Sequence, residues 1–425
     1  MRRLLAGLAL PAAVLAWGCG SGGNATSSAT HPLTPTQAPR PALGLIEDNA
    51  ELLSPPASAT RSGGSAYAAA RERLTALHPR YIRLLIDWAA LQPERDRPPA
   101  LQAQSDGCAR AVGPCASYRG VRAELAAIAD QQRAARAQGR AAFEVVLDLF
   151  GAPAWAANAP SGCELADARP FSRPLSEAGL AGYRALIRSL LALGRSEGVA
   201  LEWWSPWNEP NDPVFLSPQR ASCTVEAPTL APGVYAQLAE AMAGELGADG
   251  EQHQMLLGEL NAFATDSVHR TSVASFVAAL PERVLCFGSV WAIHAYAAWG
   301  DASPKVDPVA TFEHDLDARG SCARHAQIWV TEAGAGAPHP GRRRPPGGDA
   351  ERAGCDALAG QLEQWARDPR VGAVFQYSFR EDPAFPVGLL SADLSHVYPA
   401  YGVWLRFARA RAQGQVPAAL GAACA

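Results

Sequence analysis

Residues 141–155 read AAFEVVLDLFGAPAW, an apolar run that ends at a turn containing Gly151 and Pro153. A segment rich in Ala and Leu with helical spacing lies on either side of it, 119–138 before the run and 175–196 after it. Short apolar strands that alternate with helices are typical of a parallel sheet covered by helices. The stretch therefore predicts one strand of an α/β fold.

The same unit of apolar run, loop and helical segment recurs from residue 42 onward. The other apolar runs are 42–47, 80–86, 200–207, 254–260, 289–294, 327–331 and 371–377, and further helical segments are 64–78, 231–246 and 349–366. Eight such units predict a single (β/α)8 TIM barrel with enlarged βα loops over residues 42–425. The alternative is an open doubly wound sheet, but no G-x-G-x-x-G turn follows the first strand.

The N-terminus has the pattern of an export signal. Two arginines precede a short apolar stretch, and residues 1–18 are predicted to be a signal peptide. Residues 19–41, rich in Gly, Ser, Thr and Pro, are predicted to be a flexible tether. The junction resembles a bacterial lipoprotein signal in which Cys19 carries the lipid, although Ala16 stands where that pattern prefers Leu. A plain secretory signal is the alternative.

The cysteines support export. The chain has nine, and eight remain when Cys19 is set aside. Disulfides persist in exported proteins, and the expected pairs are Cys108–Cys115, Cys163–Cys223, Cys286–Cys322 and Cys355–Cys424. Buried free thiols are the alternative, whereas a metal site is disfavoured because the sequence has no Cys-x-x-Cys pattern or Cys/His cluster. The formal net charge of −4 predicts no broad basic surface, so nucleic acid is not an expected partner.

A TIM barrel places its functional residues at the carboxyl ends of its strands. The side chains at or just beyond the predicted ends are Arg83, Asp87, Trp88, Asp148, Trp155, Asn208, Glu209, Glu259, Asn261, His294, Tyr296, Glu332, Gln376, Tyr377 and Arg380. Glu209 and Glu332 follow the fourth and seventh strands, on different sides of the barrel, so they can face each other across its mouth. Cleavage of a glycosidic bond needs such a pair, one carboxyl protonated and one ionised. Trp203, Trp204 and Trp207 lower the polarity near Glu209, which suits the protonated role.

Four motifs in these places are similar to those of clan A glycoside hydrolases. WNEPN at 207–211 resembles the clan's acid/base motif after the fourth strand, and WVTEAG at 329–334 resembles its nucleophile motif after the seventh. HAY at 294–296 matches the sixth-strand His-x-Tyr, and YIR at 81–83 resembles the second-strand arginine region. The motifs span nearly the whole chain from residue 42 and are most like family 39 and its relatives, then family 5.

The resemblance implies a retaining enzyme that needs no cofactor. Glu209 would be the general acid/base and Glu332 the nucleophile, with carboxyl groups about 5–5.5 Å apart. Asn208 would bond the 2-hydroxyl of the sugar. Tyr296 would orient Glu332, with His294 beside it.

The resemblance also assigns a cation and aromatic platforms to the substrate site. Arg83 would bond Glu332 and keep it ionised. Many members have a tryptophan at the end of the eighth strand, but this chain reads VFQYSFR there. Tyr377 or Phe379 would take its place, or Trp299 from a neighbouring loop. Trp155 is a further platform candidate, with core packing as the alternative for it and for Trp299.

Plainer interpretations of some of these residues stay open. In the alternative interpretation, His294 is a core histidine whose ring nitrogens are hydrogen-bonded and have no role in the site. Arg83 is then an ion-pair partner with a structural role. Three other acids, Asp87, Asp148 and Glu259, lie near strand ends without a surrounding motif. The arginines at 342–344 are a solvated loop or, alternatively, a site for an acidic sugar.

We expect an exported monomer, lipid-anchored or secreted, that cleaves O-glycosidic bonds of an oligo- or polysaccharide by double displacement. The clan resemblance favours β-linked or equatorially linked substrates, and membrane contact would come only through a lipid on Cys19. Loops 93–118, 156–174 and 211–230 would wall the cleft. The alternatives are a catalytically silent carbohydrate-binding lipoprotein, a transglycosylase that uses the same residues, and a metal-dependent barrel hydrolase, which the absence of a strand-end His-x-His disfavours.

Overall fold

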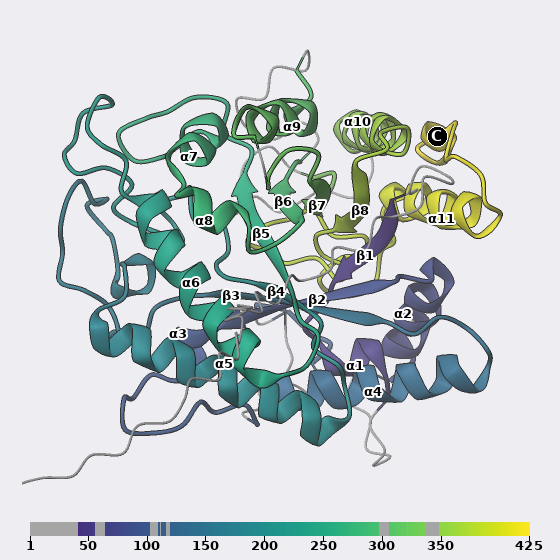
Figure 1. Ribbon diagram of the computed structural model, residues 1–425. Helices are drawn as coiled ribbons and strands as arrows, with labels where there is room; N and C mark the ends of the chain where they lie inside the picture. Colours follow the sequence, from purple (N-terminus) through teal and green to yellow (C-terminus); the bar gives the residue numbers. More distant parts are fainter. Residues whose placement is uncertain are drawn as a thin grey trace, which may run out of the picture. The chain divides into compact units, whose positions relative to one another are not determined.

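In a computed structural model of the chain, eight parallel strands form a closed barrel in sequence order (Figure 1). They are β1 (Ala42–Ile46), β2 (Tyr81–Asp87), β3 (Glu144–Phe150), β4 (Trp203–Ser205), β5 (Gln254–Asn261), β6 (Val290–His294), β7 (Gln327–Ala333) and β8 (Val371–Gln376). β1 pairs with β8 as well as with β2, which closes the barrel. The predicted (β/α)8 fold is confirmed, and the open doubly wound sheet is excluded.

The structure describes residues 41–55, 64–102, 109–110, 112–115, 120–296, 306–320, 322–336 and 348–425, all within the unit Ala38–Ala425. Several of the sequence predictions fall outside the described residues. They are the signal peptide, the tether to residue 40 with Cys19, Cys108, Trp299 and the arginines 342–344.

Helices surround the barrel (Figure 1). They are α1 (Ala50–Leu53), α2 (Gly64–Leu77), α3 (Trp88–Leu91), α4 (Val121–Ala137), α5 (Glu177–Glu197), α6 (Ala231–Asp249), α7 (Val273–Ala279), α8 (Glu282–Leu285), α9 (Pro308–Ala318), α10 (Asp349–Trp365) and α11 (Pro399–Ala412), with 3-10 turns at Pro170–Ser172 and Leu420–Ala423. The five predicted helical segments are α2, α4, α5, α6 and α10. None of the helices in the described part of the chain combines the length and the apolar character that a bilayer span requires.

Helix α5 shows how the sequence sets an element and how that element supports the mouth of the barrel. The Ser176 hydroxyl accepts from the Gly179 N–H at 3.0 Å and caps the first turn. Gly198, with φ of +70°, ends the helix in the left-handed region, where glycine has no steric penalty. The Tyr183 hydroxyl on the buried face donates to the Pro206 carbonyl at 2.7 Å. The helix therefore holds the turn that carries the fourth-strand motif.

Aromatic side chains fill the barrel interior. The rings of Tyr81, Trp203 and Phe375 all lie against Trp329 or against one another, with centroids 4.4–6.3 Å apart. Gly44 makes room for this layer, because a Cβ there would lie 2.2 Å from the Phe375 ring. The interior is therefore a packed core, and polar chemistry is left to the carboxyl ends of the strands.

Three of the predicted disulfides are present: Cys163–Cys223, Cys286–Cys322 and Cys355–Cys424. The first joins the loop after β3 to the loop after β4, two of the loops predicted to wall the cleft. The pairing of Cys115 with Cys108 stays a prediction, because Cys108 lies outside the described residues.

Candidate active site

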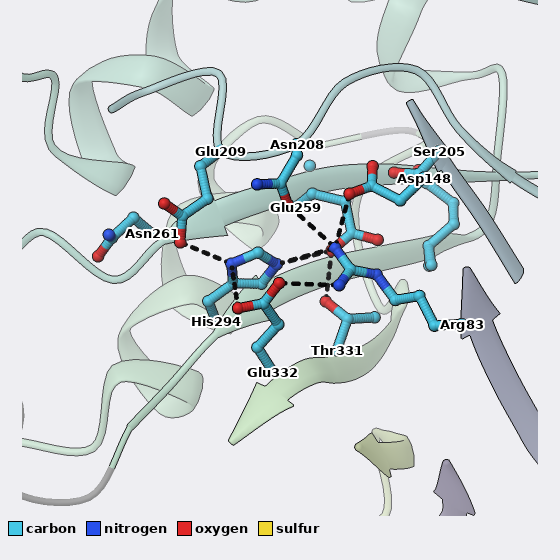
Figure 2. Close-up of polar contacts among 12 residues, drawn as sticks. Arg83, Asp148, Ser205, Asn208, Glu209, Glu259, Asn261, His294, Thr331 and Glu332 are labelled. Carbon is cyan, nitrogen blue, oxygen red and sulfur yellow. Dashed lines mark hydrogen bonds and ion pairs between the residues drawn. The ribbon is translucent and has the colours of Figure 1, made fainter. Parts of the chain in front are cut away.

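Arg83 on β2 lies at the centre of a cluster of polar side chains at the carboxyl ends of the strands (Figure 2). Its side chain is fully buried. Its Nη1 donates to Glu332 Oε1 at 2.8 Å. Its Nη2 lies 2.8 Å from Asp148 Oδ2, 3.0 Å from Asn208 Oδ1 and 3.2 Å from Glu259 Oε2. One cation therefore holds side chains from β3, the β4 turn, β5 and β7.

Glu332 on β7 is held by donors from β2 and from the segment at the end of β6. Besides Arg83, the Tyr296 hydroxyl donates to Glu332 Oε2 at 2.5 Å. His294 Nδ1 lies 3.4 Å from the same oxygen. Hydrogen bonds and a cation stabilise the ionised form of a carboxyl group. The Glu332 side chain is therefore held in one orientation, and 6% of the residue's surface is exposed.

Glu209 stands in the turn after β4 in a backbone conformation that few non-glycine residues adopt. Its φ is +38°. Such conformations persist only where the surrounding structure holds them, and they are most frequent at functional sites. The preceding residue, Asn208, anchors the turn because its N–H bonds the Leu149 carbonyl at 2.9 Å. Glu209 Oε1 lies 2.7 Å from His294 Nδ1. A carboxyl oxygen of Glu209 and one of Glu332 are within 4.8 Å of each other.

His294 on β6 joins the mouth of the site to its buried floor. Its Nδ1 faces Glu209, and its Nε2 lies 2.8 Å from Glu259 Oε2. Burial by itself lowers the pKa of a histidine, but Glu332 and the hydrogen bonds to Glu209 and Glu259 outweigh it and raise the pKa of His294 to about 10. The imidazole is therefore an imidazolium at neutral pH, which makes it part of the charge arrangement and not a neutral core histidine.

Glu259 and Asp148, which no sequence motif singled out, are the buried acids of the cluster. Burial would raise the pKa of Glu259, but Arg83, His294 and the Thr331 hydroxyl lower it to about 2. Burial raises the pKa of Asp148 well above its usual range, although Arg83 opposes the shift. The pKa values of the two buried acids are therefore shifted in opposite directions.

The position of Glu259 depends on an irregularity in β5. The pairing of β5 with β6 shifts register between Gly258 and Leu260, and Glu259 has a φ of +53°. Such bulges re-aim side chains next to active sites. Gly258 is the one sequence signal for it, because glycine inside an apolar run marks a bulge or a close approach. A Cβ there would lie 2.6 Å from the Ala292 carbonyl.

The loops after β4 and β5 are tied together behind Glu209. The fully buried Asn211 side chain donates to the carbonyls of Asn261 and Thr271 and accepts from the Asn261 N–H at 2.9 Å. Burial raises the pKa of the next residue, Asp212, to about 7, and Glu209 adds to the increase. Asn211, the last residue of the WNEPN motif, is thus a structural clamp.

Three partly exposed aromatic rings lie on the Glu332 side of the site. Tyr296, Tyr377 at the end of β8 and Phe385 in the following loop are in edge-to-face contact, with centroids 5.1–6.5 Å apart. The sequence predicted Tyr296 and Tyr377 as site residues, whereas Phe385 carried no sequence signal. Phe379 is fully buried in the core and does not offer a platform, which excludes that alternative to Tyr377.

The remaining candidates have contacts outside this cluster. The Trp155 indole packs edge-to-face on Trp88 and donates to the Gln92 carbonyl at 2.9 Å, contacts that favour its packing alternative. Asp87 caps α3 by accepting from the Ala90 N–H. Arg380 donates to the backbone carbonyl of Ala392 and to other loop carbonyls. These residues shape the surrounding loops.

Two groups among the described residues have metal-ligand spacing, with ligand atoms within 4.8 Å of one another: Glu209, His294 and Glu332, and Asp249, Glu251 and His253. In the first group both imidazole nitrogens already face carboxylates, and Arg83 neutralises Glu332. In the second, His253 bonds the Leu201 carbonyl and Asp249. We assign a metal to neither group.

No family model matches the chain, and no curated protein matches it. Solved structures are similar in fold. The catalytic domain of GH30 xylanase C from Talaromyces cellulolyticus is 14% identical, with 87% of this chain and 76% of that chain covered and a TM-score of 0.51. SrfJ from Salmonella typhimurium is 9% identical, with 87% and 75% covered and a TM-score of 0.55. A conserved exported protein from Bacteroides fragilis is 13% identical, with 88% and 78% covered and a TM-score of 0.55. At such identities the likeness shows the fold alone.

Proposed function

We propose that the chain is a retaining glycoside hydrolase of the clan A type. The observation that carries the proposal is the pair Glu209 and Glu332, which come from the fourth and seventh strands and have carboxyl oxygens within 4.8 Å. Carboxyl groups about 5–5.5 Å apart suit direct attack on the sugar, whereas inverting enzymes leave about 6.5–9.5 Å for a water molecule. The spacing supports double displacement.

Glu332 is the nucleophile in this proposal. Arg83 and Tyr296 donate to its two oxygens and fix their direction. One oxygen attacks the anomeric carbon, the bond to the leaving oxygen breaks, and a covalent glycosyl-enzyme ester forms. Water then hydrolyses the ester with retention of configuration.

Glu209 is the general acid and then the general base. It protonates the leaving oxygen in the first step and removes a proton from water in the second. Asn208 binds the sugar 2-hydroxyl. Its oxygen accepts from Arg83, and its amide nitrogen lies on the side of Glu209 (Figure 2). This orientation leaves an N–H donor for the substrate.

The substrate is an oligo- or polysaccharide, with a β or equatorial linkage. The rings of Tyr296, Tyr377 and Phe385 offer apolar faces to a sugar beside Glu332, and one structure with this fold is a xylanase domain. Three disulfides fit an oxidising compartment, which supports export. A lipid on Cys19 would then anchor the exported chain to a membrane. Within the clan we place the chain near family 39, then family 5.

The test is turnover of a panel of activated aryl glycosides and plain polysaccharides, xylan included, by wild type, Glu332→Gln and Glu177→Gln. Glu177 is an exposed carboxylate on α5 and serves as the matched control. We expect wild type and Glu177→Gln to cleave one sugar class with retention of configuration. We expect Glu332→Gln to lose turnover by about a million-fold or to background, because the covalent step has no nucleophile.

Each other outcome of this panel has a defined meaning. Silence of a folded wild type across the panel would favour the silent carbohydrate-binding alternative, which calorimetry with oligosaccharides then tests. Elongated sugar products in place of free sugar would identify a transglycosylase. Full activity of Glu332→Gln would reject the assigned nucleophile.

A further inference from the structure

The carboxylate of Glu259 is placed to act on the site without touching a substrate. It is fully buried, whereas Glu209 and Glu332 keep 8% and 6% of their surface exposed. A single oxygen, Oε2, accepts from the Thr331 hydroxyl at 2.5 Å, from His294 Nε2 at 2.8 Å and from Arg83 at 3.2 Å. Any effect of Glu259 on the reaction therefore passes through these neighbours.

His294 transmits that effect to the two mouth carboxylates. Glu259 is an ionised carboxylate, which can only accept hydrogen bonds, so the ring nitrogen facing it must carry a proton. Nε2 is then protonated whether the ring is neutral or charged. The exchangeable proton of His294 is the one on Nδ1, which lies 2.7 Å from Glu209 and 3.4 Å from Glu332.

We propose that Glu259 is a positioning residue for acid catalysis: it holds the Nε2 proton of His294, so that Nδ1 of the same ring and Glu209 share one proton. That proton is the one Glu209 delivers to the leaving oxygen. The catalytic meaning of the inference rests on the proposed function. The arrangement of protons on His294 does not.

The shared proton moves as the bonds change. As Glu332 bonds to the anomeric carbon, it loses the negative charge that helps to hold the proton on His294. The proton passes through Glu209 to the leaving oxygen, which takes the electron pair of the broken bond. His294 is then neutral with Nε2 protonated, and Glu209 is a carboxylate. In the second step Glu209 removes a proton from water, and the water oxygen bonds to the anomeric carbon. The ester bond breaks, its electron pair returns to the Glu332 carboxylate, and the proton returns to the pair of His294 and Glu209.

Charged groups from several strands surround His294, and each of them can affect its titration. Glu209 faces it from the β4 turn, Glu332 from β7, Arg83 from β2 and Asp148 from β3, while Tyr296, two residues beyond it, bonds Glu332. Asp148 offers a matched control. It is as buried as Glu259 and also bonds Arg83, but its hydrogen bond goes to the arginine, whereas Glu259 bonds His294 as well.

The experiment is NMR of the full chain with ¹⁵N-labelled histidine, in wild type, Glu259→Gln and Asp148→Asn. The chain has nine histidines, so the His294 signals are assigned by their loss in His294→Asn. We expect His294 of wild type to be doubly protonated at neutral pH and to keep its Nε2 proton when it titrates. In Glu259→Gln its midpoint falls by about one pH unit or more, because a counter-charge is lost. In Asp148→Asn the midpoint stays near that of wild type.

Three results would overturn the inference. One is loss of the Nε2 proton in wild type, which decides the question even where Glu259→Gln does not fold. Another is an unchanged His294 midpoint in Glu259→Gln. The third is an equal fall in Asp148→Asn, which would mean that any buried acid on Arg83 has this effect.

Kinetics test the catalytic part separately. We expect Glu259→Gln to lose about tenfold more in kcat/KM on aryl glycosides with poor leaving groups than on those with good ones, which need little acid assistance. Equal loss on both classes would reject the link to the acid step. If wild type cleaves no sugar, the proposed function fails, while the NMR titration still decides how Glu259 and His294 share their protons.

Discussion

Arg83 is the residue on which the other charges of the site depend. Burial opposes its charge, but Glu259, Asp148 and Glu332 raise the pKa of its guanidinium still further above the usual range. A planar cation with several donors can hold carboxylates from three strands at once, which a lysine ammonium does less well. The YIR motif predicted its contact with Glu332. Its contacts with Asp148 and Glu259 depend on strand-end geometry that the motif does not encode.

Replacing Glu209 with alanine should affect substrates according to their leaving groups. Poor leaving groups need a proton from the acid, so we expect kcat/KM to fall about a thousand-fold for them and far less for dinitrophenyl glycosides. Azide should restore turnover of the dinitrophenyl substrates and yield a glycosyl azide, because the anion fits the space of the lost carboxylate. An identical loss on both substrate classes would remove Glu209 from the acid role.

His294 should make the fold sensitive to alkali. Its pKa rises from 6.5 to about 10 in the folded chain, so the folded state holds the proton more tightly than the unfolded state does. The resulting stabilisation is complete below about pH 6.5 and disappears as the pH rises toward 10. Denaturant unfolding of wild type and His294→Asn should therefore show a difference in unfolding free energy that narrows from pH 6.5 to 10. A difference that stays constant with pH would contradict this.

The strands were predictable from sequence, but their irregularities were not. Each apolar run contains a strand because buried parallel strands lack polar alternation. The run 200–207 shrinks to β4 because pairing with β3 begins at Trp203. The register shifts in β5 and β6, beside Glu259 and His294, arise from hydrogen bonding between strands far apart in sequence. Local composition cannot encode them, which is why Glu259 was only an alternative acid.

The clamp between the β4 and β5 loops should control both stability and activity. Asn211→Ala removes three hydrogen bonds, made by a fully buried side chain, to the backbone of Asn261 and Thr271, so we expect a loss of about 2–4 kcal/mol in unfolding free energy. Glu209 lies two residues earlier, in a conformation its loop must hold, so kcat/KM should also fall about tenfold or more.

A control for this variant is Gln132→Ala. The Gln132 side chain, on α4, is also buried and donates to the Phe143 carbonyl before β3, away from the mouth. The Gln132→Ala variant should have a lower unfolding free energy, measured by chemical denaturation. Its kcat/KM, measured from initial rates, should stay that of wild type. If Gln132→Ala lost activity as Asn211→Ala does, general destabilisation and not the clamp would be the cause.

Closure of the barrel is what turns scattered motifs into one site. Arg83 and Glu332 are 249 positions apart in the sequence and form a 2.8 Å hydrogen bond. The repeating strand–helix pattern predicts that such residues meet at one end, because every parallel strand ends there. It does not predict loop contributions such as Phe385, since loop paths depend on contacts that carry no periodic signal.

The Cys355–Cys424 bond should be the strongest single covalent contribution to the fold among the described disulfides. It spans 69 residues, against 60 for Cys163–Cys223 and 36 for Cys286–Cys322, and it encloses β8 and α11. A cross-link of this length removes about 4 kcal/mol of chain entropy from the unfolded state. Inside the enclosed segment, the Trp404 indole of α11 donates to the Gln376 side chain at the end of β8, at 2.6 Å. The Cys355–Cys424 cross-link therefore also supports β8, the strand that Tyr377 follows.

Replacing Cys355 and Cys424 together with serine should lower the unfolding free energy by up to about 4 kcal/mol, measured in guanidinium. The kcat/KM at 25 °C should stay that of wild type, because native contacts hold β8 in place once the chain has folded. The same measurement on the Cys286→Ser, Cys322→Ser pair gives a matched comparison, with a smaller expected loss because its loop is shorter. An unfolding midpoint equal to that of wild type would mean that the unfolded chain is already compact around this loop.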